Sequence, residues 1–374
     1  MRTPTLRALA VHAVARSLRL SPSLAEAIAQ QGFVQLDPIR APARAADLIL
    51  RQRVDGYRAG DLDRAYPSLP LAEDYLHVYG VLPLAVQHLL HPRSPRHRRR
   101  IEREHPRLAR RVLDHVARSG ETHPRDLAPL LRHVRIIGGW GGETAATAHM
   151  LEALHHRGEL RVVRRANGVK VYDVALPPAP APELAPPERA RGILRALLHL
   201  YAPLPVASFR QLARMVTESS LAPKLRAAAL DALLAGPDVE RMAIAGDPWI
   251  MPADEPLCDD ADARVRLLAP FDPVVWDRRR FAAFWGWEYR LEAYTPPAKR
   301  RLGYYALPLL WHADVVGWAN AKVADRTLAV DVRYAKAAPR GAVFRRALAD
   351  EAERLRECVG AERVELREDA RRCG

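Results

Sequence analysis

An amide and a carboxylate side chain stand two residues apart near the N-terminus, in the stretch Gln35-Leu36-Asp37. In an extended segment, residues i and i+2 face the same side, so Gln35 and Asp37 project together while Leu36 faces the other way. Such a pair could hold one water molecule and activate it, and the carboxylate could also stabilise a developing positive charge. We therefore take Asp37 and Gln35 as candidate catalytic residues.

Asp37 also has a purely structural interpretation. It precedes Pro38, which disfavours helical geometry for Asp37 and makes it a natural helix N-cap. Because proline is favoured at the first helical position, we expect a helix from Pro38 to about Arg53. Capping and catalysis are compatible, and the residue pattern alone leaves both open.

Other catalytic signatures are absent from the sequence, which has no glycine-rich phosphate loop, metalloprotease helix, nucleophile elbow or Cys-x-x-Cys pair. The three cysteines, Cys258, Cys358 and Cys373, lie far apart, and none of the 14 histidines has a metal-ligand spacing. His155-His156 is expected at the end of a surface helix. We therefore expect no metal, no cofactor and a reducing compartment, the cytoplasm.

The chain of 374 residues carries a formal net charge of +14, from 58 Lys and Arg against 44 Asp and Glu. Such a surplus favours a polyanionic partner, since each phosphate contact releases counterions. A GC-rich genome would explain arginine in place of lysine but not the surplus. No apolar run approaches the roughly 20 residues that span a bilayer, and the amphipathic stretch 2–20 is interpreted as a first helix rather than a transit peptide. We expect a soluble, nucleoid-associated monomer that binds double-stranded DNA.

The N-terminal part of the chain has the order of helices and hairpins that is typical of winged helices. Residues 1–117 form an expected helical or winged-helix domain that carries Gln35 and Asp37. Residues 118–176 follow as a second such domain, in which two strands flank Asn167-Gly168, the strongest short hairpin signal.

A proline-rich stretch, 177–188, has six prolines in twelve positions and predicts a stiff linker. Beyond it, three helices and a hairpin in 189–257 predict a further winged helix. Residues 258–374 turn to strands from Val265 onward, with a closing helix at about 342–357. The expected fold class is α+β, with tandem winged helix-turn-helix domains and a C-terminal β-rich, barrel-like domain.

Two C-terminal stretches, Leu267–Arg280 and Lys299–Leu310, interleave basic and aromatic residues. This combination suits contact with phosphates and bases, although a β-domain core with a solvated basic edge would look the same. The arginine run 96–111 is likewise either a solvated helix face or a phosphate contact. The candidate DNA-binding residues of the two C-terminal stretches are Arg278, Arg279, Arg280, Lys299, Arg300 and Arg301.

Three stretches of the sequence resemble one bacterial family, the interstrand-crosslink-repair DNA glycosylases of the YcaQ (AlkX) and AlkZ kind. They read Pro-Phe-Asp-Pro-Val-Val-Trp-Asp-Arg-Arg-Arg, Tyr-Arg-Leu-Glu-Ala-Tyr-Thr-Pro-Pro-Ala-Lys-Arg and Gly-Tyr-Tyr-Ala-Leu-Pro-Leu-Leu. The resemblance spans residues 30–335 and implies tandem winged helices with a C-terminal β-domain. Gln35-Leu36-Asp37 is similar to the family's Gln-x-Asp catalytic motif, and 158–176 is similar to its wing.

The resemblance implies further site residues. An arginine-bearing helix follows the motif in the family, and Lys322 and Arg326 match family positions. This chain has Asp-Tyr-Leu-His at 74–77 where the family commonly has Tyr-Trp-Ala-His, and it also departs at 139–142 and 318–320, which bears on lesion preference. The residues added on this basis are Arg40, Arg44, Lys322 and Arg326 for DNA binding, and Tyr75 and His77 as candidate pocket residues.

The resemblance implies a monofunctional DNA glycosylase that hydrolyses the N-glycosidic bond of alkylated bases in base excision repair. N7-alkylguanine, alone or in an interstrand crosslink, is cationic and already a good leaving group. Asp37 would stabilise the oxocarbenium-like sugar and activate water, and Gln35 would position that water. A Schiff-base lyase would need a buried lysine nucleophile, and the chain has only five lysines.

Two other classes of function remain open. A non-enzymatic winged-helix DNA-binding transcriptional regulator would explain the charge and the hairpins, but it gives Gln35 and Asp37 no role. A nuclease would need a clustered acidic metal site, which the sequence lacks.

Overall fold

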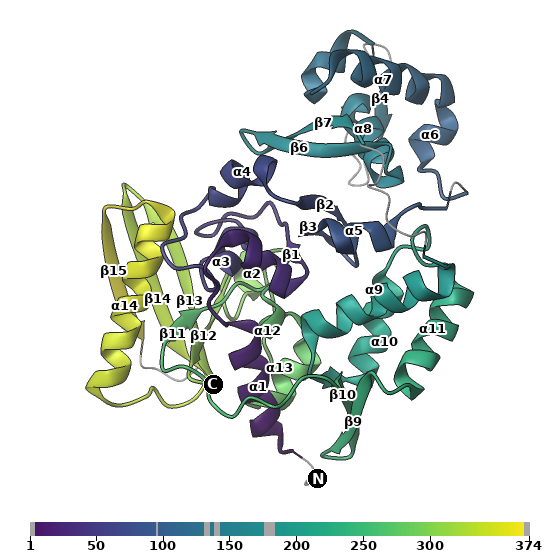
Figure 1. Ribbon diagram of the computed structural model, residues 1–374. Coiled ribbons are helices and arrows are strands. Elements are labelled where there is room, and N and C mark those ends of the chain that lie inside the picture. Colours follow the sequence, from purple (N-terminus) through teal and green to yellow (C-terminus); the bar gives the residue numbers. More distant parts are fainter. Residues whose placement is uncertain (1–3, 95, 131–134, 138–142, 176–183, 370–374) are drawn as a thin grey trace. The chain divides into compact units, whose positions relative to one another are not determined.

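The computed structural model describes residues 4–94, 96–130, 135–137, 143–175 and 184–369. The chain is mixed α+β, as expected, and forms two compact units (Figure 1). The first unit comprises Met1–Leu62, Arg195–Ala213 and Asp231–Gly374, and the second comprises Asp63–Leu194 and Arg214–Leu230.

The first unit contains a five-stranded sheet that is curled into a half-barrel (Figure 1). Neighbouring strands are antiparallel except the last pair, which is parallel because the helix α14 (Ala342–Val359) connects its two strands. The expected strands and closing helix are confirmed, and a further strand, which was not expected, follows the helix. In order across the sheet the strands are β11 (Val265–Leu267), β12 (Leu307–Trp311), β13 (Asp314–Ala324), β14 (Thr327–Tyr334) and β15 (Arg363–Asp369).

Residue spacing explains how α14 and the sheet bury their apolar sides. Leu328, Val330 and Val332 alternate with more exposed residues along β14, which is the strand period of two. Phe344, Leu348 and Leu355 recur at helical spacing along α14 and are buried. Strand and helix thus each bury one continuous apolar face.

Two N-terminal helices of the first unit begin at hydroxyl caps, the second at Ser23. In α1 (Leu6–Ser17) and α2 (Leu24–Gln31), the N-cap hydroxyls of Thr5 and Ser23 accept from backbone N–H groups in the first turn. Gly32 ends α2 in the left-handed conformation, with φ 74°.

The stretch after β11 was expected to form strands and is helical instead. It contains α12 (Pro273–Trp276) and α13 (Arg278–Trp285). The carboxylates of Asp272 and Asp277 each cap one of these helices by accepting from Val274 N–H and Arg280 N–H. Val14 and Leu18 at the end of α1 share a hydrophobic core with Phe281 and Trp285 of α13 and with Trp318 of β13.

The prediction of a helix that begins at Pro38 is wrong. The segment after β1 (Val34–Gln35) is irregular, and α3 covers only Ala45–Leu50. A helix from Pro38 would need a hydrogen bond from residue 42, and Pro42 has no N–H to donate. Asp37 therefore does not cap a helix.

The helices and the second hairpin expected in 189–257 are present as α9 (Pro186–Tyr201), α10 (Val206–Met215), α11 (Pro223–Ala235), β9 (Val239–Ile244) and β10 (Asp247–Pro252). Within the first unit, β10 pairs antiparallel with both β9 and the short β8 (Leu204–Pro205). The last three residues of the expected linker, 186–188, belong to α9, and 176–183 lie outside the described residues.

The second unit contains two longer hairpins. The Asn167-Gly168 prediction is confirmed: these residues join β6 (Leu160–Ala166) and β7 (Val169–Val174) with φ of 51° and 83°, as a type I′ turn requires. The core of this unit includes Val112, Val116 and Leu154. Its elements include β2 (Leu71–Tyr75), β3 (Tyr79–Pro83), α5 (Leu84–Leu90), α6 (Arg100–Glu104), α7 (Pro106–Ser119), β4 (Arg135–Ile137), β5 (Glu143–Ala145), α8 (Ala146–Arg157), β6 (Leu160–Ala166) and β7 (Val169–Val174), while α4 (Asp61–Ala65) spans the boundary between the units.

His155 and His156 lie at the end of α8, but not on the surface as expected. Both are buried, because α8 packs against α6, α7 and β6. His155 Nδ1 donates to the Leu160 carbonyl at 3.0 Å. Burial, followed by the charge of Arg93, lowers the pKa of His156 to about 3.

Candidate functional site

Asp37 lies on a turn that follows β1 and is half-buried. Its Oδ1 accepts from the Ile39 N–H at 2.9 Å, which holds the carboxylate on the turn. Burial raises the pKa of the Asp37 carboxyl, and the Ile39 hydrogen bond lowers it in part. A partly desolvated carboxylate of raised basicity is suited to accept a proton from water.

Gln35, the other member of the pair, has an acceptor that the fold does not use. Its side-chain Oε1 is buried and has no hydrogen-bond partner among the residues that the structure describes. An unpaired buried carbonyl costs about 1–3 kcal/mol, which a bound water or ligand would recover. Gln35 Oε1 and the Asp37 carboxylate are therefore two acceptors that stand two residues apart along the chain.

Tyr305, in the stretch Lys299–Leu310, carries a buried hydroxyl. Its side chain is 2% exposed, and within the described ranges no group hydrogen-bonds its hydroxyl. Burial raises the pKa of Tyr305, and the negative charge of Asp37 raises it further. The only sequence signal was its position in the stretch Gly303–Leu310.

Buried ion pairs hold the end of α3 against the half-barrel domain. Arg53 binds both oxygens of Asp272, at 2.8 and 3.1 Å, and Arg51 binds Glu351 at 2.5 Å. Glu351 also accepts from Gln52 and from the Leu267 N–H. Bidentate, buried pairs of this kind fix geometry, so the end of α3 is held against Asp272 and the helix α14.

Some of the ten basic residues predicted to contact DNA already bind other groups of the protein, whereas others are exposed. Arg44 pairs with the buried Asp47 at 3.1 Å, Arg278 donates to two backbone carbonyls and lies over the Tyr289 ring, and Arg300 donates to the Thr295 carbonyl. The exposed members of the set are Arg40, Arg279, Lys299, Arg301, Lys322 and Arg326, the last of which pairs with Glu362.

Arg280 is placed where a phosphate does not reach it. It is 1% exposed, and its guanidinium donates to the backbone carbonyls of Tyr201, Pro203, Pro273 and Val274. Because these contacts join α13 to the chain around β8, Arg280 is assigned a structural role and leaves the set of DNA-binding candidates.

Substitutions of the neighbouring residues Arg279 and Arg280 in α13 should thus distinguish an effect on folding from an effect on DNA binding. Arg280→Ala removes the hydrogen-bond donor of four backbone carbonyls and creates a cavity. We expect it to lower the free energy of unfolding by about 3 kcal/mol. Arg279→Ala, at an exposed position, should change stability by less than about 0.5 kcal/mol and weaken binding to duplex DNA. Urea unfolding and fluorescence anisotropy measure the two effects; equal stability losses would contradict the assignment.

Tyr75 and His77 lie in the second unit, so their predicted place in the pocket with Asp37 stays a prediction. The Tyr75 hydroxyl donates to Glu152 at 2.7 Å, and Lys170 and Tyr172 donate to the same carboxylate. His77 is buried, and burial lowers its pKa to about 3. Tyr75 is thus engaged in a polar network, and the His77 ring is neutral at physiological pH.

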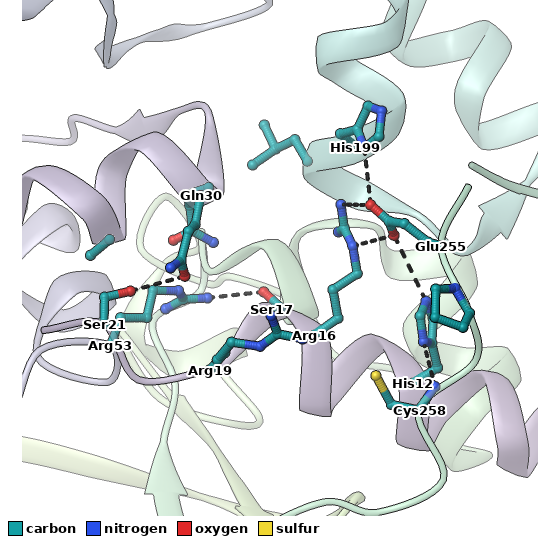
Figure 2. Close-up of a pocket in the computed structure, with 14 residues that line it drawn as sticks. His12, Arg16, Ser17, Arg19, Ser21, Gln30, Arg53, His199, Glu255 and Cys258 are labelled. Carbon is teal, nitrogen blue, oxygen red and sulfur yellow. Dashed lines mark hydrogen bonds and ion pairs between the residues drawn. The ribbon is translucent and has the colours of Figure 1, made fainter. Parts of the chain in front are cut away.

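A separate pocket of about 330 Å³ lies in the first unit, lined by residues of α1, α2 and the chain after β10 (Figure 2). Arg16 and His199 donate to Glu255 at 2.9 and 3.0 Å. Although burial opposes ionisation, these bonds hold the pKa of Glu255 at about 2. Arg16 and Arg53 already pair with carboxylates, and neither Asp37 nor Gln35 lines this pocket.

Within the described ranges, no group of three or more His, Cys, Asp or Glu side chains could hold a metal ion. None of the helices in those ranges combines the length and the apolar character that a membrane span requires.

The chain matches the family model described as DNA glycosylase AlkZ-like over residues 28–358. Since this match covers most of the chain, the protein belongs to the AlkZ-like family of DNA glycosylases and acts on DNA in repair. The resemblance and the enzyme class inferred from the sequence are thereby confirmed.

The fold is similar to that of a solved structure, the Streptomyces sahachiroi DNA glycosylase AlkZ. The two share 17% sequence identity, with a TM-score of 0.65 over 98% of this chain and 100% of that chain. At this sequence identity the similarity concerns the fold alone, and it includes the curled half-barrel sheet.

Proposed function

We propose that this DNA glycosylase hydrolyses the N-glycosidic bond of N7-alkylated guanine, with Asp37 and Gln35 as its catalytic pair. The observation that carries the proposal is the half-buried Asp37 carboxylate of raised pKa, two residues from the buried Oε1 of Gln35, for which the described part of the chain offers no hydrogen-bond partner. A positively charged leaving base needs little general acid, so a site that offers only acceptors for water suits it. A non-enzymatic transcriptional regulator would not need these two acceptors, and the family membership does not favour that alternative.

In the proposed reaction, the bond between C1′ and the base breaks and its electron pair neutralises the cationic base. The sugar develops oxocarbenium character, which the Asp37 carboxylate stabilises through its charge. The oxygen of a water held by Asp37 and Gln35 bonds to C1′, and Asp37 accepts the proton that this water loses. The products are the free alkylated base and an abasic site.

The proposed enzyme binds duplex DNA through winged-helix domains. The order α9, β8, α10, α11, β9, β10 with β10 between the other two strands supports one in 189–257, and α8 with the β6–β7 hairpin supports another in 118–176. We retain 1–117, the linker 177–188 and the β-rich 258–374 as the remaining divisions. The proposed enzyme acts as a monomer in the cytoplasm, at the nucleoid, and without a cofactor.

The test uses duplex DNA with a single N7-methylguanine. Wild-type protein should release the free base, measured by mass spectrometry, and the strand should break only after alkali because the enzyme is monofunctional. Strand breakage without alkali, together with borohydride trapping of protein on DNA, would indicate a lyase instead. A second duplex, joined by an N7–N7 interstrand crosslink, tests whether crosslinks are also substrates; no release from either duplex contradicts the proposed substrate.

A further inference from the structure

We propose that the exposed ring of Tyr294 inserts into the base stack of duplex DNA, presented by a rigid, positively charged loop. This Tyr294 loop, residues 292–304, lies between α13 and β12 in the first unit and contains the 3-10 helix η3 (Pro297–Lys299). The inference rests on the action of the family on DNA and not on Asp37 or Gln35, so the two proposals can fail separately.

Tyr294 lies at the apex of a turn. The Thr295 N–H closes this turn by donating to the Glu292 carbonyl at 2.9 Å, which leaves Ala293 and Tyr294 as its central residues. Tyr294 is 78% exposed there. A single exposed apolar side chain is ordinary on a protein surface. An aromatic ring on a fixed turn, however, offers a stacking face at a low cost in conformational entropy.

The carboxylate of Glu292 fixes the shape of the Tyr294 loop from within. Glu292 is buried, and its Oε2 accepts from three consecutive backbone N–H groups, those of Arg301, Leu302 and Gly303, at 2.8, 2.7 and 3.2 Å. Arg300 Nε donates to the Thr295 carbonyl at 2.8 Å, and two consecutive prolines, at 296 and 297, restrict the backbone. The loop is therefore ordered before DNA binds, and binding need not order it.

The C-terminal end of the Tyr294 loop is held by the half-barrel sheet. The Leu302 carbonyl accepts from Trp318 Nε1 at 2.9 Å and from Asn320 Nδ2 at 2.8 Å, and both residues belong to β13. Gly303 adopts a φ of 122°, and a Cβ there would collide with the Asn320 side chain. The sheet thus supports the loop against the force that an inserted ring experiences.

The charge of the Tyr294 loop identifies its partner. Residues 293–304 contain three basic residues and no acidic one. Lys299 and Arg301 are exposed, while the Arg300 guanidinium lies 5.0 Å from the centre of the Tyr304 ring. Cations beside an exposed aromatic ring suit a partner that presents phosphates next to bases. DNA, on which the family acts, is such a partner.

Insertion also predicts where the Tyr294 ring binds best. The faces of bases in an intact duplex are covered by their neighbours, so the ring can reach one only where a base step opens. Opening a step costs free energy, which stacking on the ring and contacts to the phosphates offset. At an abasic site the stack already has a gap, so this cost is smaller. The ring should therefore favour a duplex that lacks a base.

The test measures affinity by fluorescence anisotropy for an intact duplex and for the same duplex with a tetrahydrofuran abasic analogue. Wild-type protein should bind the abasic duplex about 10-fold more tightly. Tyr294→Ala should lose most of this preference and melt at the wild-type temperature, because the side chain is exposed. Tyr294→Phe, which keeps the ring, should behave as wild type. Neither change should alter the slope of log K against log salt, since the ring pairs with no phosphate.

Two other substitutions in the Tyr294 loop serve as matched controls. Tyr304→Ala removes a tyrosine that is 44% exposed and already covered by Arg300, so it should keep the preference. Arg301→Ala should reduce the magnitude of the salt slope by about 1 and also keep the preference. A wild-type preference in Tyr294→Ala, or a salt slope that falls in this variant, would overturn the insertion of Tyr294.

The comparison requires no base release. Its result is therefore independent of whether Asp37 and Gln35 are the catalytic pair and of which alkylated base the enzyme removes.

Discussion

Asp37→Asn is expected to slow the release of N7-methylguanine by about 10²–10⁴-fold while DNA affinity stays within about twofold of wild type. Asparagine can still accept from the Ile39 N–H, so the turn that carries residue 37 is preserved. What the variant loses is the negative charge, which stabilises the oxocarbenium-like sugar and accepts the proton of water. Single-turnover release of the base, with anisotropy for affinity, measures both quantities.

The stability of Asp37→Asn provides an internal control. Burial raises the pKa of Asp37, which means that the folded chain holds the ionised carboxylate less well than the unfolded chain does. At neutral pH this ionised group costs stability, so removing its charge should leave the melting temperature unchanged or raise it. A lower melting temperature together with slow release would attribute the loss to folding instead of chemistry.

The same pKa shift predicts the pH dependence. Asp37 must be ionised to act, so wild-type base release should fall as pH drops through its raised pKa, above the ordinary carboxyl value of about 4. Asp37→Asn should lack this acid limb. Gln35→Ala should keep the limb and release the base more slowly than wild type but faster than Asp37→Asn. Release by Asp37→Asn at the wild-type rate, with the same acid limb, would reject the assignment.

The parts of the fold that depend on neighbouring residues could be predicted from the sequence. Asn167-Gly168 sets its own turn because both residues tolerate positive φ, and the helices α1 and α2 begin at hydroxyl caps and use apolar residues at helical spacing. The role of the Gln35-Asp37 pair, inferred from two residues of one extended segment facing the same side, stays a prediction.

The parts that depend on distant residues could not be predicted. The stretch 273–285 has the composition of strands, yet Asp272 and Asp277 cap two helices in it. Arg280 looks like its exposed neighbour Arg279 in the sequence, and only the carbonyls around β8 decide that it is buried. Tyr305 is typical of a β-domain core, and only the structure shows that its buried hydroxyl has no hydrogen-bond partner among the described residues.

Binding to undamaged duplex is expected to weaken about 10³-fold between 50 and 200 mM salt. Each phosphate contact contributes about 0.9 to the slope of log K against log salt, and six exposed cations remain among the DNA-binding candidates: Arg40, Arg279, Lys299, Arg301, Lys322 and Arg326. The formal net charge of +14 supplies the long-range attraction on which such contacts depend. Anisotropy titrations over this range of salt measure the slope.

Single substitutions then locate the contacts within that slope. Lys322→Ala should reduce its magnitude by about 1 if Lys322 contacts a phosphate, and should weaken binding equally for all sequences. Arg326→Ala should have a smaller effect, because its guanidinium already pairs with Glu362. A wild-type slope near zero would mean that the surplus charge is a property of the surface at large and that the enzyme holds DNA through contacts other than phosphate pairing.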